Sequence, residues 1–252
     1  MTFRTWKSRS AGRRPSERRS PTPLANVVAG DAPVGGEGRI TALRTQPNKP
    51  ERVFLDVDGR YIGALSDIEV YERRLAVGLL LDADTLATLQ ERAAHQSLLD
   101  ATLHYVSFRP RSEQELRRYL RYRGASDEAA EAVVADLRPL GQVDDEAFAR
   151  FWMDNRQRFR PRGERLVRSE LRAKGVTSET LDAVEEADPP VDQEELAVRA
   201  AQSHVRRLQG EPWLEFRRKL TAYLLRRGFD YGIAGAVTKR LWEGSPPDDV
   251  SD

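Results

Sequence analysis

Apolar positions change their spacing part-way along the chain. Between residues 39 and 65 they alternate with polar positions, as in RITALRT, RVFLDV and RYIGAL, and Asp58-Gly59 separates the last two runs. Alternation predicts β-strands with one buried face, and Asp-Gly between two such runs predicts a hairpin turn. We therefore expect two or three short antiparallel strands, followed by helices that Ser66 and Asp82 cap.

Beyond about residue 93 the apolar positions recur every three or four residues, as in amphipathic helices. One segment occurs three times: RPRSEQELRRYLRYRG at 109–124, RPRGERLVRSELRAKG at 160–175 and, altered at its start, WLEFRRKLTAYLLRRG at 213–228. Each copy is preceded and followed by a further helical segment. The chain is therefore expected to be mainly α, with a tandem array of three three-helix modules in an elongated, curved body.

Each copy ends in leucine, two variable residues, a basic residue and glycine. Glycine at this place is typical of a helix end, where the residue after the last turn adopts a positive φ that side chains disfavour. The basic residue before it suits the negative end of the helix dipole. We predict a positive φ at Gly124, Gly175 and Gly228.

These patterns divide the chain into six parts. Residues 1–38 are basic and rich in Ser and Pro, and they lack the apolar residues that would offset the entropy lost on ordering, so we expect a disordered tail. The other parts are a small N-terminal β-hairpin with helices (39–92), module 1 (93–143), module 2 (144–190), module 3 (191–244) and an acidic C-terminal tail (245–252).

Charge and composition narrow the function. The net charge is +1, from 41 basic and 40 acidic residues, but residues 155–175 carry eight Arg or Lys and residues 176–195 carry eight Asp or Glu. Segregated blocks of opposite sign indicate charged surfaces. The chain has no cysteine, which excludes disulfides and zinc–thiolate sites. No apolar run is long enough to span a bilayer, so we expect a cytoplasmic protein without membrane contact.

No group of residues indicates catalysis. Asp144 and Asp145 lack a third ligand at helical spacing, so we interpret them as the cap and first turn of a helix. His95, His104 and His204 lie far apart and lack carboxylate or serine partners at recognisable spacing. Phosphate-binding loop fingerprints are absent from the sequence. We expect no enzyme activity, no metal site and no cofactor.

The chain resembles the RecX regulatory proteins of bacteria, modulators of the RecA recombinase. The resemblance rests on YVSFRPRSEQELRRYLRYRG, LGQVDDEAFARFW, RFRPRGERLVRSELRAKGV and YLLRRGFDYGIAGAV, in this order and spacing. It extends from about 39 to 243, because ERVFLDVDGRYIGALS is similar to the N-terminal part of longer family members. The proline-bearing segment at 185–195 departs from the family pattern.

The resemblance implies a non-enzymatic protein that lodges in the groove of the RecA–single-stranded DNA filament. There it would restrain strand exchange, ATP hydrolysis and the coprotease role. We expect a monomer whose partners are the RecA filament and single-stranded DNA. The resemblance does not decide whether double-stranded DNA is a further partner. The alternative is a helical-repeat protein that binds DNA regardless of sequence.

Cations of the three repeated segments are the candidate contacts. Apolar positions occupy one face of each middle helix, so most cations are expected on the exposed face or at the helix end. Arginine binds phosphates and carboxylates bidentately, which fits a periodic polyanion. A solvated face with intrahelical ion pairs is the other interpretation. The candidates are Arg109, Arg111, Arg117, Arg160, Arg162, Arg168, Lys174, Arg217, Arg226 and Arg227.

Overall fold

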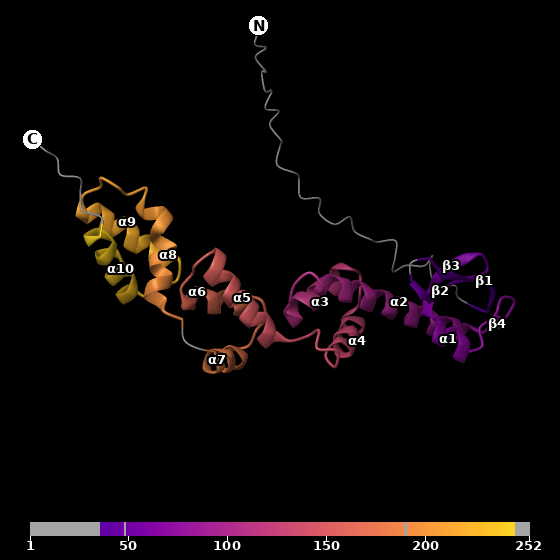
Figure 1. Ribbon diagram of the computed structural model, residues 1–252. Coiled ribbons are helices and arrows are strands. Elements are labelled where there is room, and N and C mark those ends of the chain that lie inside the picture. The colour runs from indigo at the N-terminus through magenta and orange to yellow at the C-terminus, as the bar shows by residue number, and fades with distance from the viewer. Residues whose placement is uncertain (1–35, 48, 189–190, 245–252) are drawn as a thin grey trace, which may run out of the picture.

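The computed structural model describes residues 36–47, 49–188 and 191–244 (Figure 1). Within these ranges a small sheet comes first and helices dominate the rest of the chain, so the expected mainly α fold is confirmed. The two expected tails fall outside the described residues, except for residues 36–38, the last of which begins the first strand.

The N-terminal part is an antiparallel sheet with the strand order β3-β2-β1-β4. Asp58 and Gly59 form the predicted hairpin turn, with φ of 49° and 75°. Helix α1 begins after the predicted cap Ser66, whose hydroxyl accepts a hydrogen bond from the amide of Glu69. The elements are β1 (Gly38–Gln46), β2 (Lys49–Val57), β3 (Arg60–Ser66), α1 (Asp67–Glu72) and β4 (Leu80–Leu81). Strand β4 was not predicted, because two residues are too few to show alternation.

Helix α2 (Ala83–Val106) connects the sheet to module 1. It begins after the predicted cap Asp82. Leu86 and Leu89 in its first half belong to the core under the sheet, and Leu98 in its second half belongs to the core of module 1. A single helix therefore ties the two cores together.

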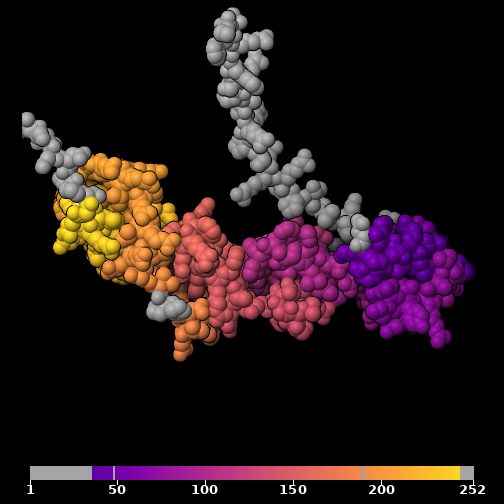
Figure 2. All heavy atoms as spheres, in the orientation of Figure 1, coloured from indigo at the N-terminus to yellow at the C-terminus, as the bar shows by residue number. Residues whose placement is uncertain are grey.

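The three modules follow one another along an elongated, bent body (Figures 1 and 2). Each has its own core, to which the aligned leucines Leu120, Leu171 and Leu224 belong. The end of α2 packs with α3 (Glu113–Tyr122) and α4 (Asp127–Leu137) in module 1. Module 2 contains α5 (Asp145–Phe159), α6 (Glu164–Ala173) and α7 (Ser178–Ala187), and module 3 contains α8 (Gln193–Val205), α9 (Trp213–Arg226) and α10 (Tyr231–Glu243).

The middle helices α3, α6 and α9 meet end to end. The cap residue of α3, Ser112, donates its hydroxyl to the carbonyl of Lys174 at the end of α6, at 2.7 Å. The cap residue of α6, Gly163, donates its amide to the carbonyl of Arg227 at the end of α9, at 2.9 Å. The repeated sequence thus contains both halves of one contact: the starts of the first and second copies each receive the basic-glycine end of the next copy.

The closing glycines have the predicted positive φ: 87° at Gly124, 90° at Gly175 and 89° at Gly228. Two of them also allow a close approach between modules. A Cβ at Gly175 would lie 2.6 Å from the Cβ of Gln114, and one at Gly228 would lie 2.3 Å from the Cβ of Leu166. A Cβ at Gly124 would meet no described atom within 4 Å, because this helix end does not dock on another module.

Helix α9 differs from the other two middle helices at its start. It has 14 residues, whereas α3 and α6 have 10 each. Trp213 aligns with Arg160, so an extra helical turn occupies the positions where the earlier copies have Arg-Pro-Arg. The altered start of the third copy is therefore a structural change and not merely sequence drift.

Candidate polyanion-binding cleft

Several candidate cations are held in ion pairs and do not project freely into solvent. Arg168 pairs with Asp182, at 2.7 Å, and with Glu185, both on α7. Arg117 pairs likewise with two glutamates of module 1. The acidic segment that follows the basic segment therefore neutralises part of it inside module 2. Arg117 and Arg168 are therefore not solvated cations on an open helix face, because carboxylates of their own or the next helix pair with them.

Modules 1 and 2 meet at junction 1–2, where Arg109 and Lys174 lie on either side of Glu115. Their nitrogens are 3.0 and 2.5 Å from its carboxylate. Burial alone would raise the pKa of Glu115, but hydrogen bonds from Arg109 and Lys174 outweigh it and the pKa is lowered. Arg111 lies with its guanidinium carbon 3.8 Å from the ring centre of Tyr105. The carboxylate makes this junction much less positive than its cations alone would.

Modules 2 and 3 meet at junction 2–3, which contains a cleft of about 590 Å³. Of the described residues that line it, five are arginines and none is an aspartate or glutamate. We call it the arginine cleft, and its arginines are Arg160, Arg162, Arg199, Arg226 and Arg227. Four of these were candidates from the sequence. Arg199 on α8 was missed, because it lies outside the repeated segment.

One aligned position accounts for much of the difference between the junctions. Glu115 in the first copy corresponds to Leu166 in the second, 51 residues later. Leu166 lines the arginine cleft and lies against Gly228. It brings no charge, so Arg160 and Arg227 lack the counterpart of the Glu115 carboxylate.

Neutral groups hold two of the cleft arginines. Arg227 donates to the carbonyl of Pro161 at 3.4 Å, and its guanidinium carbon lies 5.0 Å from the ring centre of Tyr223. Arg199 donates to the carbonyl of Gln157 at 2.9 Å. Carbonyls and rings orient a guanidinium without cancelling its charge.

The other cleft arginines differ in exposure. Arg160 and Arg226 are exposed, whereas Arg162 is half-buried and forms an ion pair with Glu170. The pKa of a nearby histidine, His204, is lowered. Burial, and then the charges of arginines that include Arg226 and Arg227, lower the pKa of His204.

The remaining candidates do not enlarge the cleft. Arg217 is exposed on α9 and does not line it.

Asp144 caps α5, accepting from the amide of Ala147 at 2.8 Å, as predicted. His95 lies 2.7 Å from Asp136, a carboxylate 41 residues away that sequence spacing did not reveal. In the part of the chain that the structure describes, no helix is long and apolar enough to cross a membrane, and no cluster of three His, Asp or Glu could hold a metal.

The helical modules match models of a known family. Family models described as the first, second and third three-helix domains of RecX match residues 99–137, 144–184 and 192–237. Regulatory protein RecX of Lactobacillus delbrueckii subsp. bulgaricus is 31% identical over 207 residues, 80% of this chain and 74% of that protein. Regulatory protein RecX of Lactobacillus johnsonii is 29% identical over 213 residues, 83% of this chain and 77% of that protein.

Two solved structures share the fold. A crystal structure of regulatory protein RecX superimposes with a TM-score of 0.63 at 23% identity, covering 80% of this chain and 99% of that one. RecX from Lactobacillus salivarius superimposes with a TM-score of 0.51 at 20% identity, covering 58% and 96%.

Proposed function

The chain belongs to the RecX family of regulatory proteins, and we therefore propose that it regulates the RecA recombinase by docking on the RecA–single-stranded DNA filament. In this proposal the modules lie along the filament groove and the arginine cleft contacts the DNA backbone. Docking restrains strand exchange, ATP hydrolysis and coprotease activity. The protein acts as a cytoplasmic monomer and catalyses no reaction itself.

The arginine cleft is the observation that carries this proposal. Five arginines line one hollow that no described Asp or Glu lines. Arg162 pairs with Glu170 outside the hollow, and the repulsion among the other four falls when a polyanion enters. Planar guanidinium forks match phosphate oxygens bidentately. Each neutralised phosphate also releases condensed counterions, which favours binding at low salt.

The shape of the molecule supports a filament as the partner. Modules placed one after another along a bent body present a surface much longer than a single globular domain does (Figure 2). Such a surface suits contact with several repeating subunits at once, and several weak contacts then act together.

Strand exchange by the cognate RecA, with substoichiometric amounts of this protein added, tests the proposal. We expect inhibition by the wild type and at least a tenfold loss of potency for the double variant Arg160→Ala/Arg226→Ala. Losing one or two charge-assisted contacts at about 1.5–3 kcal/mol each accounts for that loss. The difference shrinks as salt rises, because screening weakens both proteins' contacts.

The matched control is Arg118→Ala/Arg240→Ala, which removes two exposed arginines that do not line the cleft. It should inhibit like the wild type. Equal potency of the cleft variant and the control at low salt would show that the cleft arginines are only a solvated surface.

The same cleft also fits free DNA, which keeps the sequence-independent DNA-binding protein as the alternative function. Under that alternative, affinity for bare single-stranded DNA is tight, and its logarithm falls by about 0.7 per phosphate contact for each unit of log salt. Under the filament proposal, bare DNA binds weakly and potency depends on RecA being present.

A further inference from the structure

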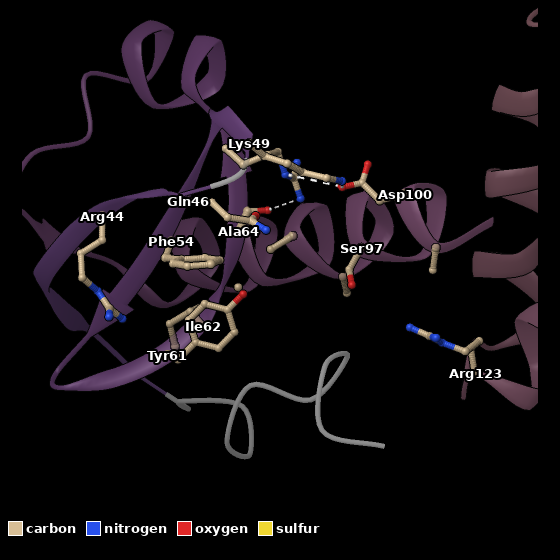
Figure 3. A pocket seen from close by; sticks show the side chains of 15 residues that line it. Arg44, Gln46, Lys49, Phe54, Tyr61, Ile62, Ala64, Ser97, Asp100 and Arg123 are labelled. Atoms are coloured by element: carbon tan, nitrogen blue, oxygen red, sulfur yellow. Dashed lines mark hydrogen bonds and ion pairs between the residues drawn. The ribbon is translucent and has the colours of Figure 1, made fainter. Parts of the chain in front are cut away.

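A second basic hollow lies between the N-terminal sheet and module 1 (Figure 3). Its volume is about 590 Å³, and it is lined by residues of β1, β2, β3 and α2, together with Arg123 at the end of α3. We call it the sheet pocket. Most of its lining precedes the three matched helical domains, and Asp100, Ala101 and Arg123 belong to the first of them.

Small residues create this hollow. A Cβ at Gly63 would lie 2.4 Å from the Cβ of Ala93, so α2 crosses the sheet in close contact with the β3 backbone. Beyond this crossing the facing positions carry side chains too short to fill the gap between helix and sheet. The short residues that line the pocket are Gly63, Ala64, Ala93, Ala94, Ser97 and Ala101.

Positive charge dominates the lining. Arg44, Lys49, Arg52 and Arg123 line the pocket. Arg44 forms an ion pair at 2.7 Å with Asp56, which does not line it, and the lining itself holds a single carboxylate, from Asp100. That carboxylate is already engaged, since it accepts a hydrogen bond from Lys49 at 3.1 Å and another from Gln96 at 3.0 Å. An anion entering the pocket therefore meets more cations than the protein itself neutralises.

Arg52 is unusual because its charged side chain is buried without a full set of partners. The residue is 5% exposed, and its Nη2 donates to the carbonyl of Ala64 at 3.0 Å. Its Nε lies 3.7 Å from the Asp100 carboxylate, too far for a hydrogen bond, and neither Nε nor Nη1 has a hydrogen-bond partner among the described residues. Arg123 also has a buried Nε without one. Buried N–H donors left unpaired are costly, and an anionic oxygen would satisfy them.

Two aromatic rings stand on the sheet beside these cations. Phe54 and Tyr61 are half-buried, with ring centres 5.7 Å apart and planes at 86°. Phe54 pairs across the strands with Arg44 on one side and with the small Ala64 on the other. In Figure 3, Arg123 reaches from α3 toward the rings across the hollow. Proteins that bind single-stranded nucleic acid combine these two features: the bases stack on aromatic rings, and the backbone lies in a basic groove.

We propose that the sheet pocket binds a nucleotide unit of single-stranded nucleic acid, with the phosphate at Arg52 and Arg123 and the base against Tyr61 and Phe54. A bare phosphate would use the cations but not the rings. An acidic peptide would likewise leave the rings without a matching planar group. This site does not depend on the proposed RecA regulation, because it requires only the chain and a free strand.

Photo-crosslinking provides a readout local to the pocket. The full chain is mixed with a single-stranded DNA oligonucleotide that carries 5-iodouracil, irradiated, digested and sequenced by mass spectrometry. We expect adducts on Tyr61 or Phe54, and they should persist in Arg160→Ala/Arg226→Ala, which alters only the arginine cleft. Adducts confined to other regions of the protein would overturn the proposal and leave the RecA proposal intact.

Affinity for labelled oligothymidylate, measured by fluorescence anisotropy in the Arg160→Ala/Arg226→Ala background, tests the residue roles. Phe54→Leu/Tyr61→Leu should bind roughly fivefold or more weakly, because base stacking is lost. Tyr71→Leu is the control, since Tyr71 is 84% exposed on α1 and does not line the pocket. The same comparison with oligouridylate shows whether DNA or RNA is preferred, and a loss of affinity in Phe54→Leu/Tyr61→Leu with either strand supports the site.

Two variants that each remove one arginine complete the test. Arg123→Gln should weaken binding more than Arg121→Gln, because Arg121 lies on the same helix but not in the pocket. Ser97→Phe fills the hollow from α2 and should abolish crosslinking at Tyr61. If inorganic polyphosphate or a poly-glutamate peptide competes as well as the oligonucleotide and the ring variants bind like the wild type, the nucleotide assignment is wrong.

Discussion

Gly124 and Gly228 share one backbone conformation but differ in what surrounds them. Both end a middle helix with φ close to 90°, so any side chain there is strained to a similar degree. A Cβ at Gly228 would in addition lie 2.8 Å from the backbone nitrogen of Leu166, whereas one at Gly124 would enter open space. The pair separates the cost of the backbone conformation from the cost of blocking a junction.

We predict that Gly124→Ala lowers the free energy of unfolding by about 1 kcal/mol, from the left-handed conformation alone. Gly228→Ala should cost ~1–3 kcal/mol more, because the new methyl group overlaps the backbone of module 2. Urea unfolding of both variants measures the difference. Equal losses would mean that junction 2–3 tolerates the methyl group and is looser than the structure shows.

The structure also changes which arginines suit a functional test. Arg160, Arg162 and Arg168 together looked removable from the sequence, because all three lie outside the apolar stripe. Arg162 and Arg168 in fact pair with carboxylates inside module 2, so replacing them would disturb folding as well as binding. Arg160 and Arg226 are the better pair, since both are exposed.

At the scale of elements, the end-to-end stacking of α3, α6 and α9 solves a problem that every helix has. The last carbonyls of a helix lack partners within it. Here the carbonyls of Lys174 and Arg227 accept from the cap residues Ser112 and Gly163 of the preceding middle helix. The negative end of one helix dipole thus meets the positive end of the next, which is a favourable alignment.

Junction 1–2 should weaken in acid because of Glu115. Its pKa is lowered from an ordinary 4.5, so its contribution to stability is complete above that pH and is lost as pH falls through the folded-state pKa. We expect the difference in unfolding free energy between wild type and Glu115→Gln to stay constant from about pH 7 to about pH 5 and then shrink toward pH 3. Urea unfolding across this range measures it. A difference that persists undiminished at the acid end would exclude an ionised Glu115 as the source.

Local signals made the elements predictable. Asp144 and Asp145 were interpreted as the cap and first turn of a helix, and α5 begins at Asp145 with Asp144 as its cap. The hairpin at Asp58-Gly59 followed from these turn residues and the alternating runs on either side of them. The arginine cleft was not predictable, because α8 supplies Arg199 and only the docking of module 3 on module 2 brings it to Arg160. The pairing of Arg168 with α7 was not predictable for the same reason. Helical periodicity shows which face of a helix is apolar, but it does not show which residues cover the polar face.

At the scale of the whole molecule, positive charge gathers where parts of the chain meet. The sheet pocket lies between the sheet and module 1, and the arginine cleft lies at junction 2–3, while Glu115 offsets the cations at junction 1–2. Repeats in the sequence predicted the elongated body. They did not predict this uneven charge, to which Leu166 in place of Glu115 and Arg199 outside the repeated segment both contribute.

The junctions should hold the modules at fixed orientations. The chain has no cysteine, so a pair can be introduced at Glu179 and Lys239, both exposed, and labelled for single-molecule energy transfer. We predict one narrow distance population for the wild type and for the Gly124→Ala control. Gly228→Ala should broaden it, because the close contact of α9 with α6 is lost. A broad population in the wild type would mean that modules 2 and 3 move independently.

The extra first turn of α9 has a consequence for how such a chain can lengthen during evolution. A duplicated module 2 would carry both the Arg-Pro-Arg-Gly start and the Ala-Lys-Gly end, so it could be inserted within the array and dock on both neighbours. A copy appended after module 3 would find that start replaced by the helical turn at 213–216. Growth by gene duplication is therefore open inside the series and closed at module 3, which makes α9 the terminator of the repeat.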